Sequence, residues 1–89
     1  MNYTKKDISI LRQIKKRNAT TELMSMSIKK IQEDTDVSIL KIRQALSKFI
    51  QDGYVNEGFK KGNAKTYYIT NAGISKLYKL LGGDNCAKI

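Results

Sequence analysis

The residues of this sequence that could do chemistry are basic and amide side chains, and they gather in one segment. Between Val37 and Gln51 the chain carries three cations and no acidic residue. Apolar residues recur in the same segment every three or four positions, so a helix formed there would bury one face and expose the other. A merely solvated face usually mixes both signs of charge. This exposed face is therefore expected to meet an anion.

Several side chains of this segment are suited to contacts with DNA. Arg43 can donate two hydrogen bonds to guanine O6 and N7, and Gln44 can pair with adenine N6 and N7. Leu40 can touch a thymine methyl group, and Lys41 and Lys48 suit phosphates. We expect a DNA interface formed by Ser38, Leu40, Lys41, Arg43, Gln44, Ser47 and Lys48. The alternative is an ordinary solvated face or, for Leu40, packing against the preceding helix.

Two further groups of cations are candidate DNA contacts. The turn around Gly62 holds Lys60, Lys61, Asn63 and Lys65, and a basic tip of this kind can enter a minor groove that A·T-rich sequence has narrowed. Lys29 and Lys30 follow Ser27, a candidate helix cap whose neighbouring N–H groups favour a phosphate. The alternative for the tip is a solvated hairpin turn.

The composition points away from catalysis. The chain has 89 residues with 17 Lys and Arg against 8 Asp and Glu, a net charge of +9, no His, and Cys86 as its one cysteine. The acids are scattered, and we find no metal-ligand spacing, no phosphate-binding glycine loop and no nucleophile–base pair. We therefore expect no enzyme activity, no cofactor and no metal. Nucleic acid, an anionic membrane surface and an acidic protein are the natural partners of such a charge, unless the protein is simply basic.

The chain is expected to act in the cytoplasm. Its first 16 residues lack the apolar core of a signal peptide, and no run approaches the 18 apolar residues that a membrane span requires.

The periodicity predicts one domain over residues 1–82, followed by a flexible tail over 83–89. We expect helices over 4–17, 28–35 and 38–51, with Ile39, Ile42, Leu46 and Phe49 of the third facing inward. A short extended piece or loop is expected near 20–24. After Gly53 the pattern becomes β-like, and it predicts a hairpin closed by the segment TYYIT. A last helix begins at Thr70 or Asn71 and ends at Gly82-Gly83.

This order of elements resembles a winged helix-turn-helix domain. The stretch VSILKIRQALSKFIQDGYV is similar to the recognition helix and first wing strand of MarR-like and PadR-like regulators, and YYITNAG, residues 67–73, is similar to the segment that closes their wing. The resemblance implies an α+β fold with a three-helix core, a β-hairpin wing and a C-terminal helix. It also implies a recognition helix 38–51 in the major groove and a basic wing 58–66 at the adjacent minor groove.

The function expected from these features is sequence-specific binding of double-stranded DNA. The protein would be a transcriptional regulator or an accessory protein of a plasmid, phage or mobile element, acting at an origin of replication or of transfer in conjugation. A winged-helix adaptor between proteins and a binder of RNA or single strands remain alternatives.

A homodimer is expected, because one recognition helix reads only a few base pairs. A larger DNA-processing or transcription complex is a further candidate partner. The candidate dimer surfaces are the last helix, through Leu77, Tyr78, Leu80 and Leu81, and the first helix. Binding as monomers on repeated sites is the alternative.

Overall fold

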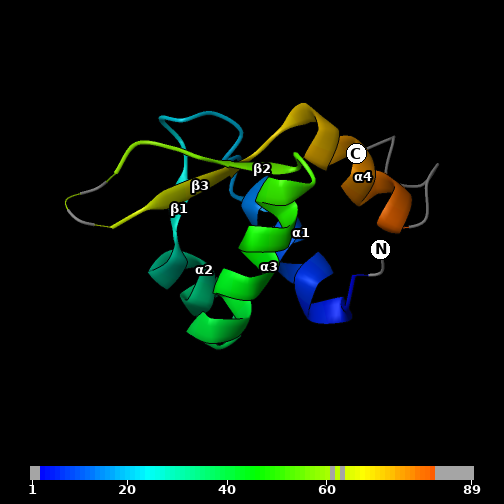
Figure 1. Ribbon diagram of the computed structural model, residues 1–89, viewed down its shortest axis with the longest axis horizontal. Coiled ribbons are helices and arrows are strands. Elements are labelled where there is room, and N and C mark those ends of the chain that lie inside the picture. Colours follow the sequence, from blue (N-terminus) through cyan, green and yellow to red (C-terminus); the bar gives the residue numbers. More distant parts are fainter. Residues whose placement is uncertain (1–2, 61, 63, 82–89) are drawn as a thin grey trace.

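The computed structural model describes residues 3–60, 62 and 64–81. Its elements follow the order helix, strand, helix, helix, strand, strand, helix (Figure 1). The bounds are α1 (Lys5–Lys16), β1 (Met26–Ser27), α2 (Ile28–Thr35), α3 (Ile39–Gln51), β2 (Val55–Glu57), β3 (Thr66–Ile69) and α4 (Asn71–Leu80). The expected α+β class, with helices flanking a hairpin, is confirmed.

Each described helix begins at a hydroxyl side chain that accepts a hydrogen bond from a backbone N–H of the first turn. Thr4 and Asp7 form the reciprocal capping box expected at the start of α1. Ser27, Ser38 and Thr70 cap α2, α3 and α4 in the same way. Because these caps satisfy N–H groups that have no partner inside the helix, the sequence fixes where each helix starts.

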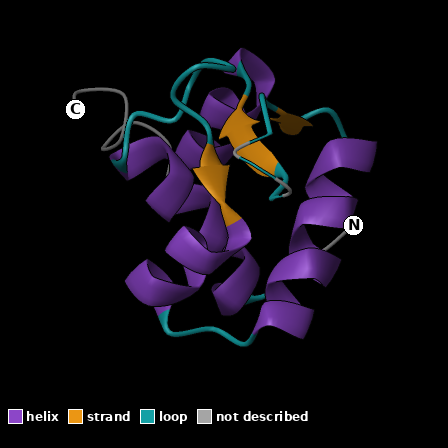
Figure 2. Ribbon diagram, turned by 90° about the vertical axis from the view of Figure 1, so that its left-hand side faces the viewer, coloured by secondary structure: helices purple, strands orange, loops and turns teal. Residues whose placement is uncertain are grey.

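The strands form a three-stranded antiparallel sheet in the order β1-β3-β2. Val55 lies opposite Ile69, and Met26 lies opposite Tyr67. Of the two expectations for residues 20–24, the loop is confirmed, because residues 21–24 form bends and a turn and β1 begins only at Met26. The β2–β3 hairpin projects to one side of the helices (Figures 1 and 2).

α1 lies at the centre of the molecule and contacts α2, α3, α4 and β3. The core around it is completely buried, and its large side chains include Ile10, Leu11, Ile14, Ile31, Ile42, Phe49, Val55 and Ile69. Two expectations about individual residues are wrong. Ile39 is 40% exposed because it lies in the first turn of α3, beyond the packed part of that helix. Leu77 is only 2% exposed, so it packs in the core and cannot form a dimer surface.

A buried polar cluster lies at the loop end of the hairpin, where Gly58 follows β2 and Thr66 begins β3. The side-chain oxygen of Thr66 lies 2.7 Å from Ser25 Oγ and donates to the carbonyl of Phe59. Gly58 fits only because it lacks a Cβ, which would lie 2.2 Å from Ser25 Oγ. These contacts hold the loop end of β2 and β3 against the segment that precedes β1.

No helix in the described part of the chain is long and apolar enough to cross a bilayer. Several sequence expectations fall outside the described residues, namely the contacts of Lys61 and Asn63, the helix stop at 82–83 and the tail over 83–89.

Gly73 in α4 is predicted to be essential for packing that helix on the sheet. A Cβ at this position would lie 2.2 Å from the Tyr54 carbonyl oxygen and 2.7 Å from Ile69 Cγ1. Gly73→Ala is expected to destabilise the protein by about 1–3 kcal/mol, despite the better helix propensity of alanine. Urea unfolding measures the change. Ser75→Ala, on the exposed face of α4, is the control and should be nearly neutral; equal stability of the two variants would contradict the packing argument.

Candidate nucleic-acid interface

The outer face of α3 presents the side chains that the sequence assigned to base contacts. Arg43, Gln44 and Ser47 are exposed, and Leu40 is 68% exposed. Leu40 therefore does not pack against α2. Ser38 is exposed as well, but its Oγ accepts from the backbone N–H of Lys41 and serves as the helix cap. α3 thus offers donors, acceptors and one apolar side chain along a single surface.

A groove runs between α3 and the hairpin. It is a hollow of about 630 Å³, and its walls come from α2, α3 and the hairpin: Ser27, Ile28, Lys29, Arg43, Ala64, Lys65 and Tyr67. We name this surface the α3–hairpin groove. A second hollow along α3 is lined by Lys41, Arg43, Gln44, Ser47 and Lys48. Arg43 lies in both hollows, so cations of all three elements face one continuous surface.

Tyr67 forms the inner wall of this groove. It is only 8% exposed, and burial, together with the nearby Glu57 carboxylate, raises the pKa of its hydroxyl, while Arg43 opposes that effect. The phenol therefore stays protonated and can donate a hydrogen bond. Tyr67, Ile28 and Ala64 were not assigned to the interface from the sequence, because strand alternation alone marks Tyr67 as a core residue.

Lys41 and Lys48 are not simply free phosphate contacts, because both pair with the buried carboxylate of Asp7. Lys48 Nζ lies 2.8 Å from Asp7 Oδ2, and Lys41 Nζ lies 3.2 Å from Asp7 Oδ1. The Asp7 side chain has no exposed surface, whereas the side chain of Lys41 is 26% exposed and that of Lys48 is 33% exposed. The carboxylate thus fixes both ammonium groups at the edge of α3. Sequence reasoning recognised Asp7 only as part of a helix cap.

Asp7 is ionised in spite of its burial. Burial alone would raise the pKa of its carboxyl, but the hydrogen bonds from Lys48 and from the Thr4 backbone N–H, together with the ion pair with Lys41, outweigh it, and the pKa lies below its ordinary value. A buried charge of this kind is tolerated because its partners carry the opposite charge.

The remaining candidates differ in position, because Lys29 and Lys65 line the α3–hairpin groove and the others do not. Lys29 is exposed at the start of α2, and Lys30 is exposed with its ammonium 3.8 Å from Glu33. Lys60 and Lys65 are exposed on the hairpin. On α4, Tyr78 and Leu80 are half-buried and Leu81 is 37% exposed, so part of the expected dimer surface remains accessible.

Comparison with known proteins identifies relatives of one kind. No family model matches this sequence. The DNA-binding protein TubR of Clostridium botulinum C phage is 37% identical over 81 residues, which cover 91% of this chain and 100% of the relative. The relatives found are TubR proteins, so the finer resemblance to MarR-like and PadR-like regulators is not confirmed.

Two solved structures share the fold. The solution structure of the DNA-binding TubR fragment from Clostridium botulinum has a TM-score of 0.71 and 38% identity, and the alignment covers 90% of this chain and 99% of that one. TubR from Bacillus megaterium pBM400 has a TM-score of 0.79 over 91% of this chain and 89% of its own. Its identity is 18%, so this likeness concerns the fold alone.

Replacing Asp7 tests the buried carboxylate. Asp7→Asn removes the charge that both lysines share and is expected to cost about 2–3 kcal/mol of stability at pH 7. Because the folded pKa lies below the unfolded one, this contribution is complete above the unfolded pKa of about 3.9 and is lost as the pH falls through the folded value. Chemical unfolding of wild type and variant across this pH range measures it.

Asp34→Asn is the control for this prediction. Asp34 is bonded to Arg17, whose side chain is 47% exposed, and a pair with one solvent-exposed partner is expected to contribute less than a carboxylate shared by two lysines and fully buried. A loss for Asp7→Asn no larger than the loss for Asp34→Asn would contradict the central role of Asp7.

Proposed function

Because this chain belongs to the TubR family of DNA-binding proteins, we propose that it binds double-stranded DNA sequence-specifically through a winged helix-turn-helix. In this proposal α2 and α3 are the helix-turn-helix, and β2 and β3 form the wing. The curated relative is a phage protein, which supports a role as an accessory DNA-binding protein of a mobile element. Such a protein acts in the cytoplasm, where the DNA is.

The α3–hairpin groove is the observation that carries the proposal. Lys29, Arg43 and Lys65 come from three different elements and line the same hollow. With α3 in the major groove, the backbone of one DNA strand would pass between α2 and the hairpin. Lys29 and Lys65 would then contact phosphates on either side of it, and Lys60 would reach toward the adjacent minor groove.

Base reading is assigned to the outer face of α3. Arg43 would pair with guanine, Gln44 with adenine, and Leu40 would contact a thymine methyl group. Lys41 and Lys48 keep a supporting role, because an ammonium group has three N–H donors and Asp7 does not use all of them. Their spare donors would meet phosphates at positions that the carboxylate fixes.

We further propose that the protein acts as a homodimer on paired half-sites. The accessible part of the α4 surface, Tyr78, Leu80 and Leu81, is its candidate contact.

The same DNA contacts would serve an origin of replication, an origin of transfer in conjugation or a regulated promoter. Selection of bound duplexes from a randomised pool gives the target sequence, and its positions in the host element distinguish these roles. Light scattering gives the mass of the complex.

Arg43 is predicted to determine sequence preference. Arg43→Ala should cost about 1–3 kcal/mol of binding free energy on the selected site and relax the preference at one base pair. Fluorescence anisotropy with the selected duplex and its single-base variants measures both effects.

The matched control is Lys29→Ala with Lys65→Ala. These changes should weaken all duplexes evenly and lower the slope of log K against log salt by about 2. An unchanged sequence preference in Arg43→Ala would show that this arginine does not read a base.

A further inference from the structure

The outward face of α1 carries a second row of basic and hydroxyl side chains. Its members recur at spacings of four, three and four residues, which places them on one side of the helix. All of them are exposed, whereas Ile10 and Ile14 on the other side are completely buried. We name this row the α1 stripe; it consists of Lys5, Ser9, Arg12 and Lys16.

The positive charge of the stripe is not neutralised within the described residues. None of the ion pairs found there involves Lys5, Arg12 or Lys16. The acidic residue of α1, Asp7, is turned inward to the lysines of α3. α4 packs against α1 and contains no acidic residue, and it adds the exposed Lys79.

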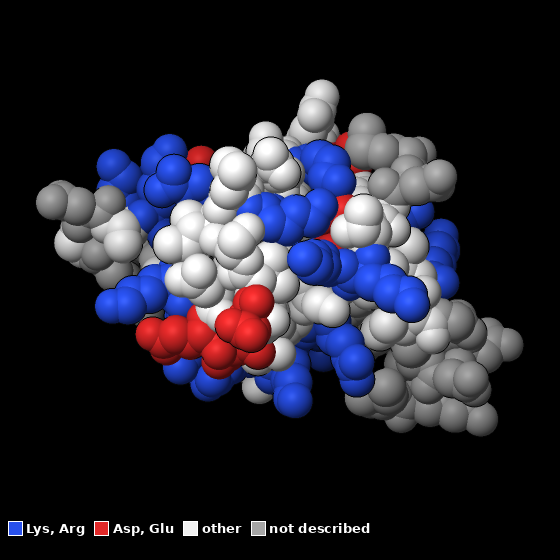
Figure 3. Space-filling view, turned by 90° about the horizontal axis from the view of Figure 1, so that it is seen from below, with Lys and Arg blue, Asp and Glu red and all other residues white. Residues whose placement is uncertain are grey.

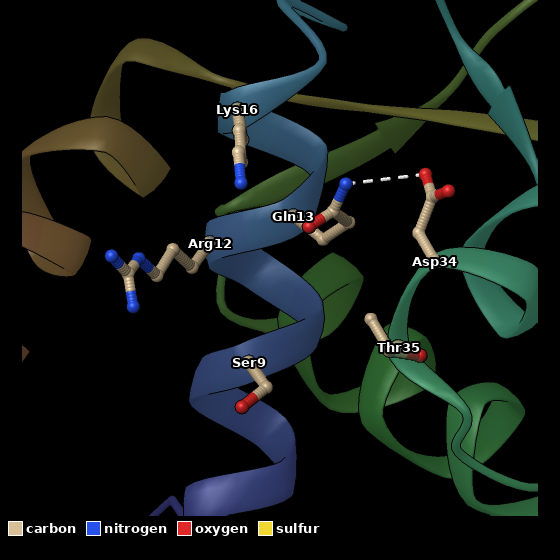
Figure 4. A pocket seen from close by; sticks show the side chains of 6 residues that line it. All are labelled: Ser9, Arg12, Gln13, Lys16, Asp34 and Thr35. Atoms are coloured by element: carbon tan, nitrogen blue, oxygen red, sulfur yellow. Dashed lines mark hydrogen bonds between the residues drawn. The ribbon is translucent and has the colours of Figure 1, made fainter.

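A polar hollow of about 300 Å³ lies beside the stripe. It is lined by Ser9, Arg12, Gln13 and Lys16 of α1 and by Asp34 and Thr35 of α2 (Figure 4). The Asp34 carboxylate accepts hydrogen bonds from Gln13 and Arg17, and Arg12 extends away from it (Figure 4). The Ser9 hydroxyl, the Arg12 guanidinium and the Lys16 ammonium are therefore left to meet an anion.

The stripe and the α3–hairpin groove are separate surfaces. α1 and α3 pack against each other, and the hollow beside the stripe shares no lining residue with the α3–hairpin groove. Seen from below, Lys and Arg side chains are spread over most of this face, and a group of acidic side chains lies at its lower left (Figure 3). The stripe can therefore contact a duplex other than the one bound in the groove.

We propose that the α1 stripe binds the phosphate backbone of a second DNA duplex, so that one protein molecule bridges two DNA segments. This inference rests on the proposed function of the α3–hairpin groove. Eleven residue steps from Lys5 to Lys16 span about 16 Å of helix, along which a duplex presents a phosphate about every 1.7 Å. Lys, Arg and Ser side chains are common phosphate contacts.

The composition of the stripe favours DNA over an acidic protein. Protein interfaces draw most of their energy from a few buried aromatic or arginine anchors in well-packed pockets. The stripe holds no aromatic or aliphatic side chain, and its arginine, Arg12, is exposed and has no apolar neighbour within the stripe. Binding to a DNA backbone needs only cations, because it is driven by the release of counterions. The second duplex is therefore bound without regard to sequence.

A capture experiment tests the bridge. A duplex with the selected site is immobilised and saturated with full-length protein, and capture of a fluorescent duplex of unrelated sequence is measured over a range of salt. The test variant is Arg12→Gln with Lys16→Gln. Lys29→Gln with Lys65→Gln removes the same charge from the α3–hairpin groove and is the matched control.

The stripe variant should bind the immobilised site within about threefold of wild type, since only long-range electrostatics change there. It should capture the second duplex at least about tenfold more weakly, with a salt slope lower by about 2. The groove variant should lose affinity for the immobilised site, and at protein concentrations that still saturate this site it should capture the second duplex as well as wild type does.

The two proposals fail in different ways. If wild type does not bind the immobilised site, the proposed function is wrong and the inference falls with it. If the site is bound but no second duplex is captured, or the stripe variant captures it as well as wild type, the inference alone is overturned. Displacement of the second duplex by poly-L-glutamate at equal charge concentration would also overturn it, because the stripe would then accept any acidic polymer.

Discussion

The buried carboxylate of Asp7 joins the start of α1 to the middle of α3. It caps α1 through the Thr4 backbone N–H and receives the ammonium groups of Lys41 and Lys48 at the same time. These two lysines lie seven residues apart, two turns along α3, so their pairing with one carboxylate fixes both the distance and the rotation of α3 relative to α1. The direction in which Arg43 and Gln44 point depends on that rotation.

The same interaction decides how the charge of the protein is distributed. A net charge of +9 on 89 residues works against a compact state through self-repulsion. Asp7 pairs with Lys41 and Lys48 at the junction of α1 with α3. Asp34 pairs with Arg17 at the junction of α1 with α2. The cations left over lie on outward faces, where water screens them. These acidic residues therefore join the helices, and basic side chains that have no ion pair in the described part of the chain form the two basic surfaces.

Local patterns predicted most of the fold, because caps and periodicity act over a few residues. Thr4, Ser27, Ser38 and Gly53 marked helix ends where the structure has them. Ion pairs between residues far apart in the sequence could not be predicted. Asp7 lies 34 residues from Lys41, and nothing in either segment shows that the two side chains are in contact. The sequence consequently assigned both lysines to phosphates and Leu77 to a surface, since a stripe of leucines on a terminal helix has the same pattern in a core and in an interface.

The hairpin shows how buried polar contacts behind the groove position one of its walls. Thr66 is completely buried and bonded to Ser25 and Phe59, and the Gly58 N–H donates to the Thr66 carbonyl at 2.9 Å. Lys65 immediately precedes Thr66 in the chain, so its position relative to Arg43 depends on this cluster and not only on the basic tip itself. A binding surface assembled from three elements needs such an anchor, because a few ångströms of movement at Lys65 would separate the cations that line one groove.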